Sequence, residues 1–518
     1  MPEQSPPQKP GKFGRDLTTG SIPRHLLMFS LPMLGGSVLQ TAYSIVNAIW
    51  VGRYLGSREM AAVTVSMPLF FLFMAVAMGL TMASNILIAQ YVGARNWTEV
   101  RRVVQNSSLL VALVSLVLLI LGELCVAPFL QLIHTPPDTL PVATGYLRIF
   151  LLAMPCNFAM FLVAAMLRGI GDSKTPLYFQ TIFLVLTAIL DPVLMFGKLG
   201  IPGAIHAVIT KIGPFTLAHP LLINLPHPHL DLGFAGFGLN GTAWAMLITM
   251  GGAVVSILLY LTAKRNPVTP SLRVLVIDRD ITWLTVKIGF PSMLQQAMAS
   301  IGMLCIIGFV NFYGEAATAA YGAALRIDQI SFMPAMAIGM AVSTLTGQNM
   351  GAGRLDRVGQ TFRWGILLSC TITAAVAVVV VCFPGLLILP FTNDAQVLAI
   401  GTQYLRIMWI SYVLFAVMFV SNGVINGAGH TMVTTLISAG GLWFVRLLLV
   451  WLLSQVVLHS VTGVWIAMVI SVGTGMIGSL IYYYSKRWQQ QVVHAAPLTP
   501  PDDAPTLTPV LDTSGESG

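Results

Sequence analysis

Few residues in this sequence could do chemistry, and the most suggestive of them lie near residue 190. Asp191 stands between an apolar run and Pro192, and Thr187 precedes it by four residues, on the same helical face. Pro192 removes a backbone donor and frees a carbonyl one turn earlier. A carboxylate, a hydroxyl and a free carbonyl predict a small oxygen-rich site for H⁺ or Na⁺. The alternative is a helix-terminal aspartate that hydrogen-bonds a neighbouring helix.

Uncharged polar residues in apolar stretches could extend this site or line a pocket. Gln40 and Asn47 lie seven residues apart, which is two helical turns, so they share a face. Asn85 and Asn157 also fall in apolar surroundings. We predict that Gln40, Asn85 and Asn157 are polar residues that line a pocket or contact a substrate. Interhelical hydrogen bonding is the alternative role for each of them.

Two opposite charges in the second half of the chain predict an intramembrane pair. Asp328 lies about 18 Å along its predicted helix, and Arg446 lies at a similar depth in another. A charge at bilayer depth costs about 2.5–3.5 kcal/mol on insertion scales, so each needs a partner. We therefore predict that Asp328 pairs with Arg446, with a role in a transport cycle as the alternative. Glu123 and Arg148, near helix ends, predict an interfacial pair.

Other chemistry is not indicated by the sequence. No GxxxxGK[ST] motif is present, so we expect no nucleotide and no ATP-driven pump. No Ser/His/Asp or metal-ligand cluster is evident, so we expect neither an enzyme nor a cofactor. His227 and His229 could bind a metal, but nothing fixes their geometry, and we expect no metal site. The five cysteines all lie in apolar stretches without a CxxC pair, which favours buried, reduced thiols.

The elements that carry these residues are predicted to be membrane helices. Hydrophobic residues make up 56% of the 518 residues and charged residues only 9%, which excludes a soluble enzyme, a disordered protein and a nucleic-acid binder. A span needs about 20 predominantly apolar residues. We predict an all-α polytopic membrane protein with twelve transmembrane helices, at 25–51, 60–91, 99–133, 138–168, 175–197, 236–263, 281–312, 316–349, 358–390, 396–427, 431–457 and 461–485.

The placement of Lys and Arg predicts the orientation of these helices. With the N-terminus inside, the inner segments hold 18 of these residues and the outer loops hold 4. Both termini are then cytoplasmic, in the plasma membrane, or in the inner membrane of a Gram-negative cell. Residues 1–24 would form an N-terminal tail and 264–280 a cytoplasmic linker. Residues 486–518, rich in Pro, Thr and Asp, would form a disordered cytoplasmic tail.

An internal repeat organises the spans. A shift of 258 residues aligns Gln90 with Gln348, Tyr146–Ile149 with Tyr404–Ile407, and Gly169 with Gly427. An insertion in the first half, 198–232, is rich in Pro and His, and we place it outside the cell. Two six-helix bundles, 25–263 and 281–485, would then be related by a parallel repeat. Such repeats are typical of transporters, with a cavity between the halves.

The repeated residues also carry a family resemblance, which covers about residues 16–484. The matching motifs are Asp16–Gly20, Val51–Gly56, Ala89–Ala94, Gly347–Ala352, Leu167–Asp172 and Leu190–Pro192. With these motifs the chain resembles the multidrug and toxin extrusion (MATE) transporters. The resemblance implies two six-helix bundles, a central cleft, and efflux of organic, often cationic compounds driven by inward Na⁺ or H⁺. It also implies that Asp191 matches a coupling residue.

The sequence departs from the family pattern at the coupling site. Asn47 stands where the family often has Asp, and Thr187 stands at a position that is often Asn. The resemblance therefore implies that both residues belong to the coupling-ion site with Asp191. The seventh span has Gln295 and Gln296 where other branches carry a carboxylate, and the tenth has no acidic residue. Asp191 is therefore the single carboxylate of the predicted pocket. Burial disfavours its charged form, and Na⁺ prefers more negative charge, so H⁺ is favoured over Na⁺.

These observations predict a secondary antiporter that exports organic drugs or toxic compounds, with cationic ones favoured, in exchange for H⁺. Its partners would be a small-molecule substrate and the lipid bilayer, and it would act as a monomer. Two alternatives stay open. One is a lipid-linked saccharide flippase of the related superfamily, against which twelve spans and few cavity cations argue. The other is a non-transporting membrane receptor or scaffold, against which the duplicated bundles argue.

Overall fold

The computed structural model describes residues 14–51, 55–133, 135–199, 230–231, 236–270, 277–392 and 394–490 of the chain. Nearly all of them are helical. One short antiparallel ladder pairs β1 (Lys198–Leu199) with β2 (Leu230–Asp231) at the base of the predicted insertion. Most of that insertion, including His227 and His229, lies outside the described residues, as do most of the two predicted tails.

Twelve helices in the described part of the chain are long and apolar enough to cross a membrane, as predicted. Seven of these spans have 28 residues or more, so tilt or extension beyond the hydrocarbon core follows. The uninterrupted helices are α1 (Ile22–Trp50), α2 (Ser57–Gly93), α3 (Trp97–Leu132), α4 (Leu140–Gly169), α5 (Lys174–Phe196), α7 (Leu239–Ala263), α8 (Arg279–Asn311), α9 (Glu315–Gly351), α10 (Leu355–Cys382), α12 (Ala395–Gly427) and α15 (Val461–Tyr484).

Two predicted spans are not single regular helices. The ninth ends at Cys382 and is followed by the short helix α11 (Pro384–Ile388), because proline favours the start of a new helix. The eleventh consists of α13 (Thr431–Ala439), a π-helical stretch (Gly440–Val445), α14 (Arg446–Trp451) and a second π-helical stretch (Leu452–Val457). Wide π turns are rare in helices, and those that occur are frequently at functional positions.

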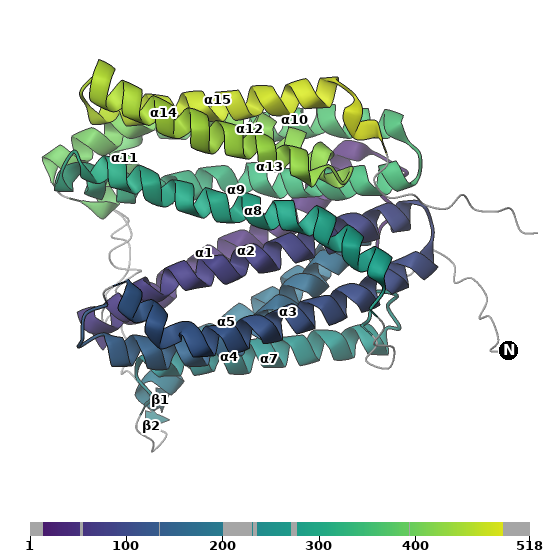
Figure 1. The fold of residues 1–518 in the computed structure, drawn as a ribbon, viewed down its shortest axis with the longest axis horizontal. Coiled ribbons are helices and arrows are strands. Elements are labelled where there is room, and N and C mark those ends of the chain that lie inside the picture. Colours follow the sequence, from purple (N-terminus) through teal and green to yellow (C-terminus); the bar gives the residue numbers. More distant parts are fainter. Residues whose placement is uncertain are drawn as a thin grey trace, which may run out of the picture.

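The helices form two lobes (Figure 1). The first lobe comprises α1 to α7, and the second lobe comprises α8 to α15. Each lobe has its own apolar core. The first core is built around residues such as Phe158 and Leu151, and the second around Trp465 and Tyr404. This is the predicted architecture of two six-helix bundles.

The first helix of each lobe also packs against the other lobe. The early turns of α1 pack with α9 and α10, where Leu26 and Phe29 share a core with Val342. Correspondingly, α8 packs along α2, and Ile281 and Ile288 belong to the core of the first lobe. The pairs α1–α9 and α8–α2 are equivalent under the repeat. The lobes therefore exchange one helix segment each at the end where both helices begin.

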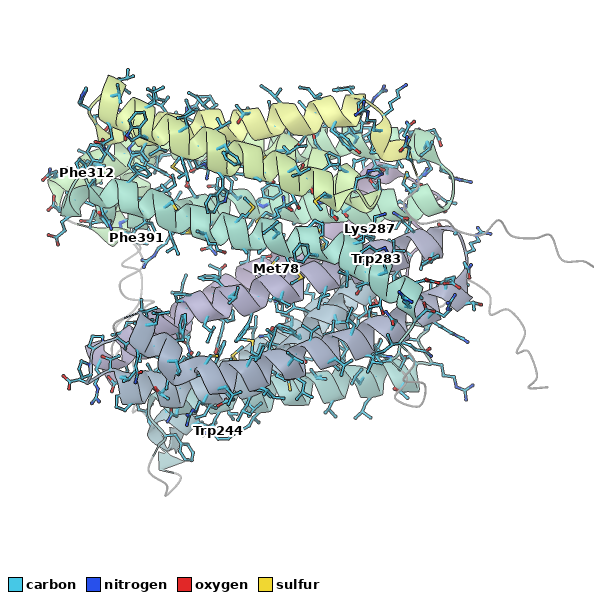
Figure 2. The ribbon with its side chains drawn as sticks, in the orientation of Figure 1. Met78, Trp244, Trp283, Lys287, Phe312 and Phe391 are labelled. Atoms are coloured by element: carbon cyan, nitrogen blue, oxygen red, sulfur yellow. The ribbon has the colours of Figure 1, made fainter. Side chains whose placement is uncertain are left out.

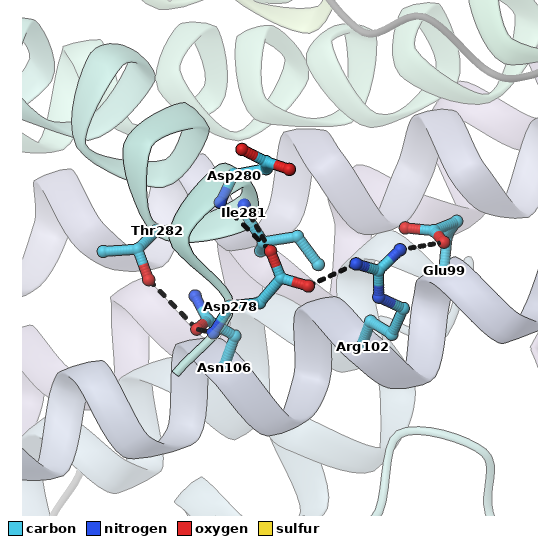
Figure 3. A network of polar contacts seen from close by, with 7 residues as sticks. All are labelled: Glu99, Arg102, Asn106, Asp278, Asp280, Ile281 and Thr282. Carbon is cyan, nitrogen blue, oxygen red and sulfur yellow. Dashed lines mark hydrogen bonds and ion pairs between the residues drawn. The ribbon is translucent and has the colours of Figure 1, made fainter. Parts of the chain in front are cut away.

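A polar network fixes the start of α8 against α3 (Figure 3). Asp278 caps α8 by accepting hydrogen bonds from the backbone N–H groups of Asp280 (3.1 Å) and Ile281 (3.2 Å). Arg102 pairs with both Asp278 and Glu99. The side-chain oxygen of Asn106 accepts from the Asp278 backbone at 2.9 Å. The cap and these partners join the linker between the lobes to the first lobe.

Candidate functional site

Asp191 is a fully buried carboxylate in the last two turns of α5. Its Oδ2 accepts hydrogen bonds from the Tyr43 hydroxyl (3.1 Å) and from the Asn47 amide (3.3 Å), both on α1. Its Oδ1 is buried and has no hydrogen-bond partner among the described residues. Tyr146 of α4 lies near enough to interact with it electrostatically. The carboxylate is thus surrounded by neutral groups, and both of its hydrogen-bond partners are donors.

The structure brings together only part of the predicted coupling site. Asn47 contacts Asp191, but the Thr187 hydroxyl does not contact the carboxylate. It donates to the Phe183 carbonyl (2.8 Å) and pairs with the Thr249 hydroxyl of α7 (2.8 Å). A threonine in a helix readily bonds the carbonyl four residues earlier, which turns its hydroxyl away. Thr187 therefore links α5 to α7.

Tyr43 was missed by the sequence reasoning. A signal for it was available, because Tyr43 precedes Asn47 by four residues and so lies on the same face of α1. A phenol can donate one hydrogen bond while its ring stays in apolar surroundings. The candidate coupling site is therefore Tyr43, Asn47 and Asp191, with Tyr146 beside it.

The three predicted pocket residues have different environments. Gln40 is exposed on α1 and accepts a 3.5 Å hydrogen bond from Gln180 of α5. Asn85 accepts from the Thr344 hydroxyl at 3.3 Å, which joins α2 to α9 across the two lobes. Asn157 is buried, and its Oδ1 has no partner in the described part of the chain. The structure does not gather these three residues around Asp191.

The predicted ion pair between Asp328 and Arg446 is absent among the described residues. Asp328 is buried in α9 and accepts hydrogen bonds from Tyr404 (2.5 Å) and Tyr412 (2.6 Å) of α12. Arg446 donates through Nε to the Ser471 hydroxyl of α15 at 2.7 Å. Equal depth along two helices does not make two residues neighbours, because each helix also has a rotation about its axis. Two tyrosines stand where the arginine was expected.

The predicted pair between Glu123 and Arg148 is confirmed. Arg148 Nε lies 3.7 Å from Glu123 Oε2, which links α3 to α4. Both side chains are partly exposed, so the pair contributes little to stability. The pair lies where the ends of two neighbouring helices, α3 and α4, come close together.

The two lobes are hydrogen-bonded to each other at one end of the molecule. Gln90 of α2 donates to the Gly427 carbonyl of α12 (2.8 Å), and Gln348 of α9 donates to the Gly169 carbonyl of α4 (2.9 Å). These two bonds are equivalents under the internal repeat. Both glutamines are buried, and their amides satisfy carbonyls at helix ends that would otherwise lack a donor.

Glycines allow the backbones to touch at this end. A Cβ on Gly93 would lie 1.9 Å from the Gln348 carbonyl oxygen, and a Cβ on Gly351 would lie 1.8 Å from that of Gln90. Both distances are far too short for any side chain. Only glycine permits this approach of α2 to α9.

The segment before α1 binds to the same end. The Leu17 N–H donates to Gln348 Oε1 at 3.1 Å, so Gln348 contacts both this segment and the first lobe. Arg354 donates to the Thr18 carbonyl (2.9 Å) and Arg357 to the Gly20 carbonyl (3.1 Å). In the part of the chain that the structure describes, every hydrogen bond and ion pair between the two halves lies toward this end.

Large apolar side chains are exposed along the outside of the helices (Figure 2). Phe312 is 75% exposed and Trp283 is 68% exposed, values that suit a lipid environment and not water. Lys287 of α8 stands one turn from Trp283 (Figure 2), where its long side chain can extend toward the lipid head groups. The surface is that of a helical membrane protein.

A family model described as MatE matches residues 32–193 and again 291–452. The chain belongs to this family. Members of the MATE family are membrane transporters, so the chain is a transporter and not an enzyme. The two matched stretches contain most of both lobes, and they confirm the parallel repeat that the sequence predicts.

Curated relatives match along almost the whole chain. It is 29% identical over 477 residues to the "Probable multidrug resistance protein YoeA" of Bacillus subtilis, covering 91% of this chain and 96% of that protein. It is 25% identical over 473 residues to the "Probable multidrug resistance protein NorM" of Thermotoga maritima, covering 91% and 94%. It is 22% identical over 472 residues to a "FAD transporter" of Shewanella oneidensis, covering 91% and 96%.

Solved structures share the fold. A crystal structure described as MATE in the straight conformation superposes with a TM-score of 0.79 at 22% identity, covering 92% of this chain and 98% of that one. Another, described as the outward-facing conformation of a multidrug resistance MATE family transporter, gives a TM-score of 0.77 at 21% identity, covering 92% and 98%. At these identities the likeness concerns the fold.

Proposed function

We propose that this MATE protein is a secondary antiporter that exports organic cations in exchange for H⁺. The observation that carries the proposal is the environment of Asp191. A fully buried carboxylate that accepts only from Tyr43 and Asn47 among the described residues, and has an unpartnered Oδ1, can change its protonation state without breaking an ion pair. That property is what a proton-coupled carrier requires of its coupling group.

The same geometry supports H⁺ over Na⁺. A sodium ion needs several oxygen ligands around it, preferably with more than one negative charge. Here the groups next to Asp191 are an amide N–H and a phenol O–H, which donate, and the Thr187 hydroxyl is directed to Phe183 and Thr249. The described residues contain no cluster of three His, Cys, Asp or Glu residues that could hold a metal ion.

Organic cations are the proposed substrates, as the family resemblance implies, because the inward movement of H⁺ compensates the positive charge that an exported cation carries out. The names of several relatives refer to multidrug resistance or export, which supports a broad range of small molecules. The FAD transporter among the relatives indicates an anionic cargo as the second candidate. A competition assay between a cationic dye and FAD distinguishes these two substrate classes.

Alternating access would proceed by rocking of the two lobes about the central cleft, which requires the end where they are joined to open. The hydrogen bonds of Gln90 and Gln348 hold that end together, and they are neutral, so they can be broken and reformed. The Lys and Arg distribution favours a cytoplasmic location for this end. The structure then corresponds to a state closed toward the cytoplasm. We place both termini inside, in the plasma membrane, and we expect a monomer.

The test is efflux by purified protein in proteoliposomes with an imposed pH gradient. Asp191→Asn mimics the protonated form, so we expect it to bind a cationic dye but to lose gradient-driven efflux. Thr187→Val is the matched control, since it removes a polar group one turn away that does not contact the carboxylate. Full efflux by Asp191→Asn contradicts the proposal. Efflux by wild type with Na⁺ alone, at constant pH, contradicts the choice of ion.

A further inference from the structure

The second lobe also contains a buried carboxylate without a cationic partner among the described residues. Asp328 is 3% exposed and lies in the middle of α9. Two arginines of the second lobe, Arg446 and Arg326, are engaged elsewhere. Arg446 bonds Ser471, and Arg326 lies over the Phe391 ring, with its guanidinium carbon 5.5 Å from the ring centre. Asp328 thus resembles Asp191 in its surroundings, although the two residues are not equivalent under the repeat.

The carboxylate is held by two tyrosines from one face of α12. Tyr404 donates to Oδ2 and Tyr412 to Oδ1, and the two tyrosines stand eight residues apart. Tyr321, one further titratable neighbour, packs its ring edge-on to Tyr404 and stacks on Trp465. Among the described residues, these tyrosines and Arg446 are the titratable and charged groups that lie around the site on the packed helices.

We infer that Asp328 is a second proton-binding site, in the second lobe, which is loaded and unloaded during the transport cycle. This inference rests on the proposed H⁺ coupling and extends it to a second carboxyl. A proton that binds Oδ1 makes that oxygen a donor to the Tyr412 oxygen. The Tyr412 O–H must then turn away from Oδ1 toward another acceptor. The proton is accommodated between Asp328 and Tyr412, without a counter-ion.

Proton binding at Asp328 acts on the contact between α9 and α12. These helices pack very closely, since a Cβ on Gly423 would lie 2.5 Å from the Gly339 carbonyl oxygen. Exchange of a donor for an acceptor at Tyr412 changes a hydrogen bond between these same two helices. Both helices continue to the joined end of the lobes, where α9 carries Gln348 and α12 ends at Gly427. Helices α9 and α12 therefore link the Asp328 site to the joined end of the lobes.

The first experiment counts protons. With the membrane potential clamped at zero, the logarithm of the steady-state drug gradient rises with the pH gradient with a slope equal to the protons exchanged per drug. We expect a slope of about two for wild type and about one for Asp328→Asn. Tyr321→Phe is the matched control, because it removes a buried phenol that does not bond Asp328, and it should keep the wild-type slope. An unchanged slope in Asp328→Asn overturns the inference.

The second measurement does not depend on drug transport. Infrared difference spectra of the reconstituted full-length protein should show the carbonyl stretch of a protonated carboxylic acid that is lost in Asp328→Asn and retained in Asp191→Asn. Tyr404→Phe and Tyr412→Phe, which keep the carboxyl, should move this band. If no band can be assigned to Asp328 at any pH at which the protein transports drug, the inference is wrong. Failure of the proposed H⁺ coupling gives a different result, because the drug gradient of the wild-type protein would then not depend on the pH gradient and the slope would be zero.

Discussion

Gln90 and Gln348 occupy equivalent positions in the two repeats, and each donates a hydrogen bond to the terminal glycine carbonyl of a helix in the opposite lobe. The two bonds, at 2.8 and 2.9 Å, are therefore the same interaction made twice. The joint between the lobes is thus symmetric under the internal repeat.

Gln90→Ala combined with Gln348→Ala should favour the state that is open toward the cytoplasm. Each lost hydrogen bond contributes about 1 kcal/mol, so the equilibrium between the access states should shift about tenfold to thirtyfold. The measurement is the alkylation rate of a single cysteine placed at Asn85, between the lobes. Gln403→Ala is the control, since Gln403 bonds Thr462 within the second lobe. Equal alkylation rates in the double variant and the control contradict the role of the two glutamines.

Gly93→Ala and Gly351→Ala should each prevent closure of the joined end. The added methyl would lie less than 2 Å from a carbonyl oxygen of the facing helix, so the lobes must separate. Alanine favours a helix more than glycine does, so a loss of transport cannot come from the helix itself. Gly359→Ala, where a Cβ meets nothing within 4 Å, is the matched control. Transport at the wild-type rate in Gly93→Ala would show that this approach is not needed.

Asn47→Asp should introduce Na⁺ sensitivity. The amide of Asn47 lies 3.3 Å from Asp191 Oδ2, so the variant places two carboxylates side by side. Such a pair shares a proton or binds a cation between its oxygens. Drug efflux at constant pH should be stimulated by a Na⁺ gradient in this variant and not in wild type. Asn47→Ser, which adds no charge, serves as the control. If Asn47→Ser also responded to Na⁺, the response would come from loss of the amide and not from the second carboxylate.

Asp278→Ala should weaken the start of α8 in a pH-dependent manner. The backbone N–H of Ile281, with Arg102 as a further cause, lowers the pKa of Asp278 below its usual value. A carboxyl whose pKa is lower in the folded protein than in the unfolded chain stabilises the folded state at pH values above the unfolded pKa, which is about 3.9 for Asp. This contribution is lost as the pH falls through the pKa of the folded state. At neutral pH we expect a loss of about 1 kcal/mol. Thermal unfolding in detergent measures it, with Asp280→Ala as the comparison, and identical curves would rule out the cap.

Leu225→Cys, in a background without the five native cysteines, should react with an impermeant maleimide added outside the cell. We expect the insertion 198–232 on the outer side because of the distribution of Lys and Arg. Ser5→Cys in the N-terminal tail should react only after permeabilisation. If Ser5→Cys reacted from outside and Leu225→Cys reacted only after permeabilisation, the topology would be inverted. The joined end of the lobes would then lie on the outer side.

The sequence alone determined the twelve spans, the repeat and the family, because apolar length and spaced identities are one-dimensional signals. It also predicted that Asp191 and Asn47 share a site, because Asp191 matches a coupling position of the family and Asn47 stands where the family often has Asp. It could not decide which polar groups face each other across helices. That depends on the rotation and tilt of each helix, which is why Asp328 meets Tyr404 and Tyr412 and not Arg446. The same reason explains why Thr187 bonds Thr249, and why the exchange of α1 and α8 between the lobes became visible only in the tertiary structure.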